Sequence, residues 1–357
     1  MSVLDLARSE LRAIRPYVPG QWEPGLVRLN ANESPWRAPG DTTERGLNVY
    51  PPPRPTMLTA KLGAHYGVDQ RQILVTRGSS EAIDVLIRGF CAAGRDSILI
   101  TPPTFDMYRL YATIQNAAIK RVPLRADQDF ALDADKLLEC VDATTKIVFI
   151  CSPNNPTGQS MARADVERIC RETAGRALVV IDEAYHEFAE AEDFGALRAR
   201  HEHVVLLRTL SKFVSLAGVR CGLLIAAPEV VEFAQNVLPP YTFPTPSIEH
   251  VLQALSTDSL RVSEERVALL KRERARLSAA LRDVPEVRKV YPSDANFIMV
   301  KTHDGAGFRE TARRAGILVR TFDDPLLVDC VRITVGRPAD NDLLLRALSG
   351  AEGGVDA

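Results

Sequence analysis

Short apolar runs alternate along the chain with longer segments that carry polar residues at helical spacing. Between residues 72 and 227 the apolar runs are QILVT, DSILI, IKRVPL, KIVFIC, ALVVIDEAY, HVVLLRTL and CGLLIAA. Several of them are apolar at consecutive positions, which is typical of strands that are covered on both faces. The alternation predicts an α/β domain with a largely parallel sheet flanked by helices.

The pattern changes after the proline-rich segment NVLPPYTFPTPS. Residues 247–282 form a long, charged, amphipathic helical tract, and strand-like FIMV, ILVRTF and CVRITVG surround the helical segment GAGFRETARRAG after it. This predicts a second, smaller α+β domain. We therefore divide the chain into residues 46–246 as the large domain, residues 247–357 as the small domain, and residues 1–45 as an N-terminal arm that also supplies part of the small domain.

Composition narrows the classes of partner. The chain has 357 residues, of which 46% are hydrophobic and 25% charged, with a net charge of -2, so it can bury a substantial core. Near-neutral charge excludes the electrostatic footprint of a nucleic-acid or membrane-surface protein. No leader pattern and no membrane-length apolar run occurs. We expect a cytoplasmic protein whose partners are small molecules.

Metal chemistry is not expected from the cysteines and histidines. Six cysteines are scattered through apolar segments without a C-x-x-C pair, and this favours buried free thiols. The six histidines are dispersed as well, and the one near pair, His201 and His203, has no third ligand at useful spacing.

Polar residues follow several predicted strands at the edge where parallel sheets collect ligands. Gly78, Ser79 and Ser80 open a helix after QILVTR, where backbone amides bind a phosphate or a serine caps the helix. Tyr108 follows DSILI and offers an aromatic face to a ligand or to the next helix. Asn155 lies in SPNNPTG after KIVFIC and presents an amide to a ring oxygen, unless that loop is only a turn.

An acid and an amine complete this set. Asp182 ends the apolar run ALVVI, where a buried carboxylate needs a cationic partner such as a protonated ring nitrogen. Lys212 follows the next strand, in RTLSKFVSLAGVRCG, among small and apolar residues. Taken alone, that lysine either reaches out to water or is kept for chemistry. Adjacent strands would deliver both groups to one edge of the sheet.

Three of these motifs, in this order, resemble the fold type I pyridoxal-phosphate aminotransferases: SPNNPTG, VVIDEAY and TLSKFVSLAGVR. LNANESP, YPPP, GSSEAI, FDMY and VRITVG narrow the resemblance to the histidinol-phosphate aminotransferase branch, over about residues 15–345. The resemblance implies a large domain with a mostly parallel seven-stranded sheet, a smaller α+β domain, and pyridoxal 5'-phosphate as cofactor.

The resemblance also implies roles around the cofactor ring. Lys212 would bond covalently to the cofactor aldehyde and later carry a proton between two carbons. Its amine must be nucleophilic near neutral pH, which burial and the nearby Arg220 favour. Asp182 would pair with the ring nitrogen, Asn155 and Tyr185 would hydrogen-bond the ring 3-oxygen, and Tyr108 would stack on the ring.

Further implied positions hold the cofactor phosphate and the second subunit. The phosphate cup would consist of Ser79, Ser80, Thr209, Ser211 and Arg220. Tyr50, in the YP segment, would reach the phosphate of the neighbouring subunit's cofactor. The active sites would then be shared across a homodimer.

Substrate choice is expected to depend on two arginines of the small domain. Arg320 and Arg332 lie in apolar strands, where a phosphate dianion is a natural partner, although surface pairing with Asp323 or Asp329 is the alternative. Histidinol phosphate has a phosphate and no carboxylate, which suits two arginines. Tyr17 and Asn32 resemble positions that line the substrate pocket, although Tyr17 alternatively anchors the arm.

The expected reaction transfers the amino group of L-glutamate to imidazole-acetol phosphate, giving L-histidinol phosphate and 2-oxoglutarate. An aromatic amino-acid aminotransferase and a phosphothreonine decarboxylase share the site pattern and stay open as alternatives. A cofactor-sensing regulator is a third, which the missing helix-turn-helix segment disfavours. Departures from the branch are Ser80 where an aspartate is common, ESPWRAPG in place of Asn-Pro-Tyr-Gly, and YPPP without an acid. They lie mainly near the expected substrate entrance.

Overall fold

The large domain is built on a mostly parallel sheet in this computed structural model, which describes residues 2–14, 17, 20 and 26–349. The strands lie in the order β1 (Ile73–Arg77), β7 (Cys221–Ile225), β6 (Val204–Thr209), β5 (Leu178–Asp182), β4 (Thr145–Cys151), β2 (Ser97–Ile100) and β3 (Ala118–Arg121). Only β7 runs antiparallel to its neighbours. The predicted seven-stranded sheet is confirmed, and each apolar run named above overlaps one of its strands.

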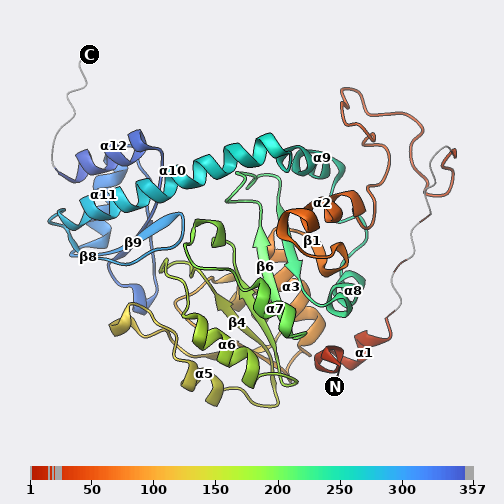
Figure 1. The fold of residues 1–357 in the computed structure, drawn as a ribbon, viewed down its shortest axis with the longest axis horizontal. Helices are drawn as coiled ribbons and strands as arrows, with labels where there is room; N and C mark the ends of the chain where they lie inside the picture. The colour runs from red at the N-terminus through yellow and green to blue at the C-terminus, as the bar shows by residue number, and fades with distance from the viewer. Residues whose placement is uncertain (1, 15–16, 18–19, 21–25, 350–357) are drawn as a thin grey trace.

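Helices cover both faces of this sheet (Figure 1). They are α2 (Thr56–Tyr66), α3 (Ser79–Phe90), α4 (Met107–Ile114), α5 (Ala134–Glu139), α6 (Arg163–Glu172), α7 (Gly195–Arg200), α8 (Pro228–Val237) and α9 (Thr245–Ala254). In β5, Val179 and Ile181 belong to one hydrophobic core while Leu178 and Val180 belong to the other. Because side chains alternate across a strand, a sheet with two cores needs consecutive apolar residues.

The small domain packs three helices against an antiparallel sheet. Its strand order is β10 (Arg320–Thr321), β11 (Cys330–Thr334), β9 (Phe297–Thr302) and β8 (Val287–Val290). Its helices are α10 (Thr257–Arg282), α11 (Gly305–Arg314) and α12 (Pro338–Leu348). The sequence analysis did not anticipate β8, whose central residues Arg288 and Lys289 are exposed, because a short edge strand lacks a run of apolar residues.

Helix α10 belongs to both domains and runs along their length (Figure 1). Val267 packs in the core that includes the large sheet, whereas Leu277 and Leu281 pack in a core of the small domain. Helix α9 packs against α2 of the large domain. Helix α10 therefore connects the two domains, and the division of the chain after residue 246 stays a prediction.

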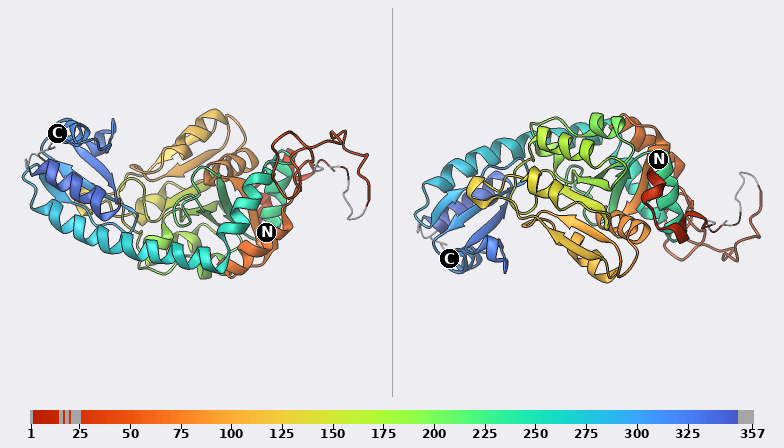
Figure 2. Two further views of the ribbon diagram at one scale, coloured as in Figure 1. Left: turned by 90° about the horizontal axis from the view of Figure 1, so that it is seen from above. Right: turned by 90° about the horizontal axis from the view of Figure 1, so that it is seen from below.

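The start of the N-terminal segment lies against the large domain, and the division that gives residues 1–45 a part in the small domain stays a prediction. The 3₁₀ helix η1 (Val3–Leu6), followed by α1 (Ser9–Arg12), places Val3 and Leu6 in the same core as α3 and α8. Residues 26–50 then form an extended arm that leaves the body at the end opposite the small domain (Figures 1 and 2). The apolar packing of η1 on α8 holds the start of the chain against the large domain.

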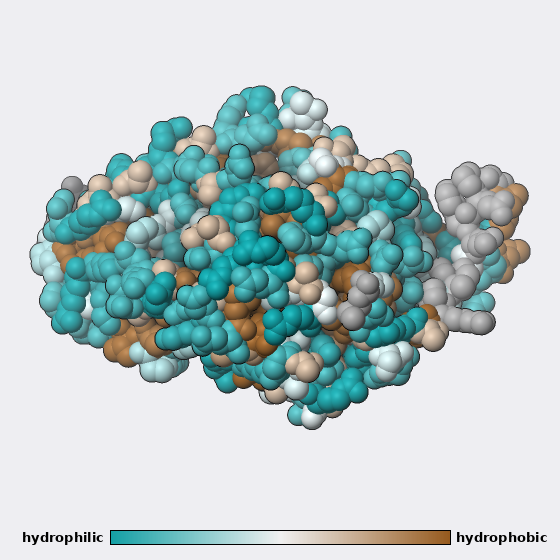
Figure 3. Space-filling model, turned by 60° about the horizontal axis from the view of Figure 1, so that its bottom comes forward, coloured by the Kyte–Doolittle hydropathy of each residue, from teal (hydrophilic) through white to brown (hydrophobic). Residues whose placement is uncertain are grey.

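The surface is mainly polar on the face that Figure 3 displays, and apolar residues appear there in small separate groups. None of the described helices combines the length and the low charge that a membrane span requires. The six cysteines are free thiols; five of them are buried and Cys140 is exposed.

Candidate active site

A cavity of about 220 Å³ lies where β4, β5 and β6 end, at the carboxyl edge of the sheet. It is lined by nine of the residues predicted for the cofactor site, namely Ser79, Ser80, Asn155, Asp182, Tyr185, Thr209, Ser211, Lys212 and Arg220. Phe105, Ala184, Cys151, Gly78 and Ala217 complete the lining. The fold thus brings together side chains that are spread over 142 positions of sequence (220 − 78).

Asp182 is a buried carboxylate with two hydrogen-bond donors, and no cation among the described side chains forms an ion pair with it. The hydroxyl of Tyr108 donates to its Oδ2 at 2.8 Å, and the backbone N–H of Ala184 donates to its Oδ1 at 3.1 Å. Burial raises the pKa of Asp182 to about 6, and these hydrogen bonds act in the opposite direction. A cation placed in the cavity would complete the charge balance of this acid.

Tyr108 does not occupy the place that the stacking prediction gave it. Its side chain is fully buried behind Asp182, where it stacks on Phe149 with ring centroids 4.6 Å apart. Phe105, three residues earlier, lines the cavity in its place, with Ala184 also in the lining. Phe105, before α4, therefore faces the cavity, whereas Tyr108, within α4, points to the core.

Two neighbouring asparagines in the SPNNPTG loop have different positions. Asn154 is fully buried; its Nδ2 donates to the carbonyl of Pro103 at 2.9 Å, and Thr104 donates to its Oδ1 at 2.9 Å. It therefore ties the loop after β4 to the loop that carries Phe105. Asn155 lines the cavity, and its Oδ1 accepts a hydrogen bond from Arg332, which leaves its amide N–H₂ free to donate to a ligand.

One end of the cavity is built for an anion. Helix α3 starts at Ser79 beside the guanidinium of Arg220, and a Cβ on Gly78 would lie 2.6 Å from Nη2 of that arginine. A Cβ on Gly222 would lie 2.2 Å from the backbone nitrogen of Ser79. Glycine at these two positions lets β7, the arginine and the helix N-terminus approach closely. Unpaired N–H groups and a guanidinium at one point favour a bound phosphate.

Two hydroxyl groups lie at the same end of the cavity. Thr209 Oγ1 is 2.9 Å from Ser211 Oγ, and the backbone N–H of Ser211 donates to Thr209 Oγ1 at 3.2 Å. Thr209 is the last residue of β6, and the turn that follows it directs the hydroxyls of Thr209 and Ser211 toward the cavity. They supply neutral donors beside the charged Arg220.

Lys212 is a half-buried amine, and it forms no ion pair with another described residue. Its Nζ lies 5.7 Å from the ring centroid of Tyr185. Burial lowers the pKa of Lys212, and the charges of Arg332 and Arg220 lower it further. Each of these causes increases the fraction of neutral, nucleophilic amine near neutral pH.

Arg320 and Arg332 face each other across the β10–β11 pair, as direct register partners. The guanidinium of Arg320 lies 6.0 Å from the ring centroid of Phe322, and that of Arg332 lies 5.9 Å from the same ring. Arg332 also donates a hydrogen bond to Asn155, which lines the cavity, so this arginine of the pair lies beside the cavity. Among the described residues, neither Asp323 nor Asp329 forms an ion pair with either arginine.

Three further predicted residues lie away from this cavity within the same chain. Tyr50 is 48% exposed and stacks on Tyr241 with centroids 4.6 Å apart. Tyr17 is 66% exposed, and Asn32 is exposed with a φ of 54°. All three belong to the N-terminal segment at the end opposite the small domain (Figure 1). A single chain does not bring them to Lys212.

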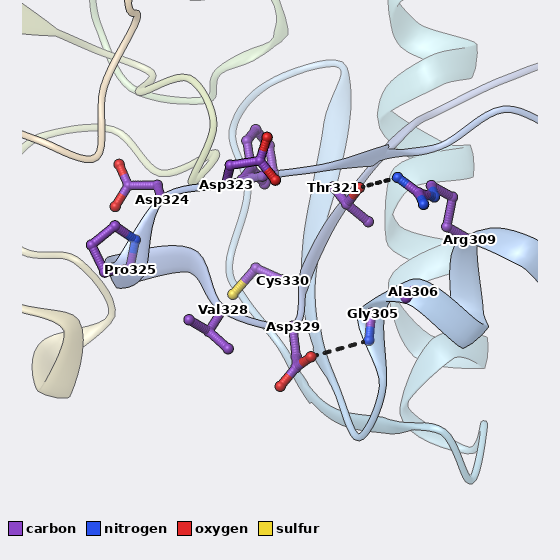
Figure 4. Close-up of a pocket in the computed structure, with 11 residues that line it drawn as sticks. Gly305, Ala306, Arg309, Thr321, Asp323, Asp324, Pro325, Val328, Asp329 and Cys330 are labelled. Atoms are coloured by element: carbon purple, nitrogen blue, oxygen red, sulfur yellow. Dashed lines mark hydrogen bonds between the residues drawn. The ribbon is translucent and has the colours of Figure 1, made fainter.

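A larger cavity of about 500 Å³ lies in the small domain, but its chemistry is different (Figure 4). Asp323, Asp324 and Asp329 line it, and Arg309 is the one basic residue among the described residues of its lining. Asp329 already accepts a hydrogen bond from the N–H of Gly305 at 3.3 Å, at the start of α11. This acidic opening does not suit a phosphorylated ligand. Over the described part of the chain, no group of three or more His, Cys, Asp or Glu could hold a metal ion.

Comparison with known proteins gives the family. Residues 29–348 match the model of the class I and II aminotransferases. The histidinol-phosphate aminotransferase of Xanthomonas campestris pv. campestris (strain 8004) is 42% identical over 353 residues, covering 97% of each chain. The chain belongs to the histidinol-phosphate aminotransferase family.

Solved structures agree on the fold of this aminotransferase family member. The histidinol-phosphate aminotransferase of Sinorhizobium meliloti, in complex with pyridoxal-5'-phosphate, has a TM-score of 0.77 at 22% identity, over 85% of this chain and 83% of that one. L-threonine-O-3-phosphate decarboxylase of Porphyromonas gingivalis has a TM-score of 0.72 at 22% identity, over 85% of this chain and 90% of that one. The fold type I architecture is therefore confirmed, and it is common to two kinds of enzyme.

The cofactor of this aminotransferase is pyridoxal 5'-phosphate, and the residues of the cavity fit it. A buried acid without a cation, Asp182, matches a protonated ring nitrogen. A helix N-terminus beside Arg220 matches a phosphate, and the half-buried Lys212 matches an aldehyde. The donor set thus agrees with the charge distribution of the cofactor.

The sequence analysis missed several residues that the structure brings to the aminotransferase site. Phe105 and Ala184 line the cavity, and Gly222 makes room for the start of α3. A signal for Phe105 existed, since it is an aromatic residue just after β2 in the same motif as Tyr108. Gly222 had no comparable signal, because the close approach of β7 to α3 is a tertiary contact.

Proposed function

We propose that this chain is the aminotransferase that uses L-glutamate and imidazole-acetol phosphate to make L-histidinol phosphate and 2-oxoglutarate, a step of histidine biosynthesis. The family membership supports the transamination chemistry and the substrate together. Among the structural features, the one that carries the substrate assignment is the Arg320–Arg332 pair beside the cofactor cavity.

Residues of the cavity divide the work of the reaction. When bound, pyridoxal phosphate supplies an aldehyde for the amine and a ring that accepts the electrons released at the substrate carbon. Asp182 would hold the ring nitrogen, while Asn155 and Tyr185 would orient the 3-oxygen. Lys212 would hold the aldehyde end of the cofactor, and its amine would move the proton at the reacting carbons. Its depressed pKa keeps a neutral amine available for this transfer.

The two arginines bind the substrate phosphate in this proposal. Like charges directly opposite on paired strands destabilise a sheet unless an anion lies between them. The ring of Phe322 contacts both guanidinium groups and restricts their orientation. Arg332 is fixed to Asn155 at the same time, so the phosphate anchor and the cofactor anchor are linked through one contact.

We also propose that the enzyme is a homodimer with shared active sites. Tyr50, Tyr17 and Asn32 lie on or beside an exposed arm that does not reach the cavity of its own chain. The arm also exposes apolar side chains, among them Leu26, Val27, Leu29 and Trp36. A second copy would cover this apolar surface and receive Tyr50 at its cofactor phosphate. The cytoplasmic location expected from the sequence stays a prediction.

A half-reaction titration tests the substrate assignment. Purified, cofactor-loaded enzyme is mixed with L-histidinol phosphate or with L-phenylalanine, and the change in cofactor absorbance is followed. We expect conversion at much lower concentrations of histidinol phosphate. Preference for phenylalanine would instead assign an aromatic amino-acid aminotransferase. Release of carbon dioxide from phosphothreonine without need for a keto acid would assign a decarboxylase.

Complementation tests the shared site. Lys212→Ala and Tyr50→Ala subunits are each expected to form impaired homodimers, whereas a mixed dimer has one site with both residues intact. Co-expression should therefore restore activity above that of either variant alone. If the mixed dimer is no more active than the sum of its parents, Tyr50 acts within its own chain or not at all.

A further inference from the structure

Tyr108 lies on the core side of Asp182, and its side chain is fully buried. The ring of Tyr108 is stacked on Phe149 at an interplanar angle of 11°, and Phe105 meets it edge-on at 5.7 Å. Its hydroxyl is 2.8 Å from Asp182 Oδ2. Two aromatic neighbours therefore leave the phenol one direction in which to point, and that direction is the carboxylate.

The hydroxyl of Tyr108 donates a hydrogen bond to Asp182. Burial and the charge of Asp182 raise the pKa of this phenol well above its usual range. The group therefore does not lose its proton near neutral pH. Its proton is directed to Asp182, so it stabilises the carboxylate form over the protonated form.

We propose that Tyr108 is a positioning residue that keeps Asp182 ionised and aimed at the ring nitrogen of the cofactor. This inference rests on the proposed role of Asp182 and adds a second residue to it. The hydrogen bond occupies Oδ2 from the core side and the Ala184 N–H occupies Oδ1. The remaining lone pairs of the carboxylate are then left for the cavity that Asp182 lines.

The other groups that face Asp182 do not titrate in a way that could imitate this effect. Cys151 on β4 and Tyr185 after β5 both have a pKa raised by burial, so they stay neutral near pH 7. Glu183, which directly follows Asp182 after the end of β5, forms an ion pair with Arg208 at 2.8 Å. Lys212 and Arg220 line the same cavity and are unchanged in every variant compared below.

The test measures cofactor affinity rather than turnover. The dissociation constant of pyridoxal phosphate from the apoenzyme is determined between pH 5 and pH 8.5 for wild type, Tyr108→Phe and Tyr111→Phe. Tyr111 lies on the same helix α4, and among the described residues its hydroxyl forms no hydrogen bond with Asp182. Groups that titrate in all three proteins, and the titration of the cofactor itself, cancel in the comparison.

We expect the affinity of wild type to fall as pH drops through the pKa of Asp182, because the protonated acid cannot pair with a protonated ring. Removing the Tyr108 hydroxyl removes a stabilising bond to the carboxylate, so that pKa rises. The fall in Tyr108→Phe should therefore begin about one to two pH units higher, the shift associated with a hydrogen bond to a charged group. Tyr111→Phe should follow the wild-type curve.

Equal pH midpoints for Tyr108→Phe and wild type would overturn the inference, even if affinity fell uniformly, since a uniform loss indicates only a packing defect. The thermal midpoint of each apoenzyme checks that Tyr108→Phe is folded. The variant Asp182→Asn tests the role of Asp182 separately from the role of Tyr108. If that variant binds the cofactor as wild type does, the role proposed for Asp182 fails; if it loses affinity while Tyr108→Phe keeps its midpoint, only the inference on Tyr108 fails.

Discussion

Arg320 and Arg332 are direct cross-strand partners on β10 and β11, with both guanidinium groups within about 6 Å of the Phe322 ring. Burial lowers the pKa of Arg332, and the charge of Arg320 lowers it as well. Two like charges held together at the edge of the cofactor cavity form an unfavourable arrangement until an anion joins them. Their placement is therefore best explained by a doubly charged ligand group.

Replacing one arginine should affect only substrates that carry phosphate. We expect Arg320→Ala to lower kcat/KM for L-histidinol phosphate by about 10- to 100-fold, the value of one lost charge-assisted hydrogen bond. The same variant should leave kcat/KM for unphosphorylated L-histidinol nearly unchanged. Steady-state kinetics with both substrates measures the difference.

Arg309→Ala is the matched control for that experiment. Arg309 is also in the small domain, and it donates to Thr321 at 3.1 Å, one residue from Arg320. It lines the acidic cavity rather than the cofactor cavity. An equal loss with both substrates in Arg320→Ala, or the same selective loss in Arg309→Ala, would argue against the phosphate anchor.

Lys212 should be the attachment point of the cofactor. Treating the loaded enzyme with borohydride should fix pyridoxal phosphate to this side chain, and trypsin should then not cleave after the modified lysine. The expected labelled peptide runs from residue 209 to residue 220, between Arg208 and Arg220. Peptide mass spectrometry reads out the position.

The Lys212→Ala variant should carry no label at this peptide, whereas Lys271→Ala should label as wild type does. Lys271 is a useful control because it is occupied by a hydrogen bond to the carbonyl of Ala189 at 2.8 Å and by an ion pair with Glu190. Labelling at another lysine in wild type would contradict the assignment.

Gly222 should be intolerant of any side chain. An added Cβ would lie 2.1 Å from the carbonyl carbon of Gly78, so β7 and the start of α3 must separate in Gly222→Ala. We expect the free energy of unfolding to fall by about 1–3 kcal/mol, as for other overpacked cores. Cofactor affinity should fall too, because the helix N-terminus moves. Denaturant unfolding and cofactor titration measure the two effects.

Gly218→Ala provides the comparison. Gly218 is near in sequence, has no positive φ, and nothing lies within 4 Å of an added Cβ. Its substitution should leave the free energy of unfolding within about 0.5 kcal/mol of wild type, as for an ordinary surface change. Equal stability losses in the two variants would show that the close approach of β7 to α3 is not the cause.

Glu187 should make the stability of the protein depend on pH. Both of its carboxyl oxygens are buried without a hydrogen-bond partner among the described residues, and burial raises its pKa from 4.5 to about 7. An acid whose pKa is raised by folding stabilises the folded state fully below its unfolded pKa. That contribution is lost as pH rises through about 7.

Glu187→Gln removes this titration. Compared with the variant, wild type should lose about 3 kcal/mol of stability between pH 4.5 and pH 8, a shift of about two and a half units at 1.36 kcal/mol each. Thermal unfolding across that range measures the difference. Glu183→Gln should instead be destabilising throughout, since it leaves Arg208 with a weaker set of partners. A constant difference between wild type and Glu187→Gln would refute the prediction.

Most of the large domain was predictable because its strands are short apolar runs with their own local signal. KIVFIC and ALVVI form β4 and β5 because consecutive apolar residues fit only a strand with a core on each side. The order of strands in the sheet, with β7 between β1 and β6, has no such local signal. It follows from which helices pack on which face.

The chemistry of the site was visible for similar reasons, but its geometry was not. Asp182 and Lys212 stand directly after apolar strands, and a parallel sheet brings such residues to one edge. Whether an aromatic side chain near that edge faces the ligand or the core depends on a rotation of one turn of α4. The sequence pattern therefore led to Tyr108, rather than Phe105, as the aromatic residue that faces the ligand.

The chain's own pattern of residues determined the α/β class, the identity of the charged groups and their order along the strands, since these depend on local composition and periodicity. Only the tertiary structure decided that Tyr108 supports Asp182 from behind, that Arg320 opposes Arg332, and that residues 26–50 leave the body as an arm. Each of those relations joins positions that no local pattern links. They arise when the sheet, the helices and the two domains pack against one another.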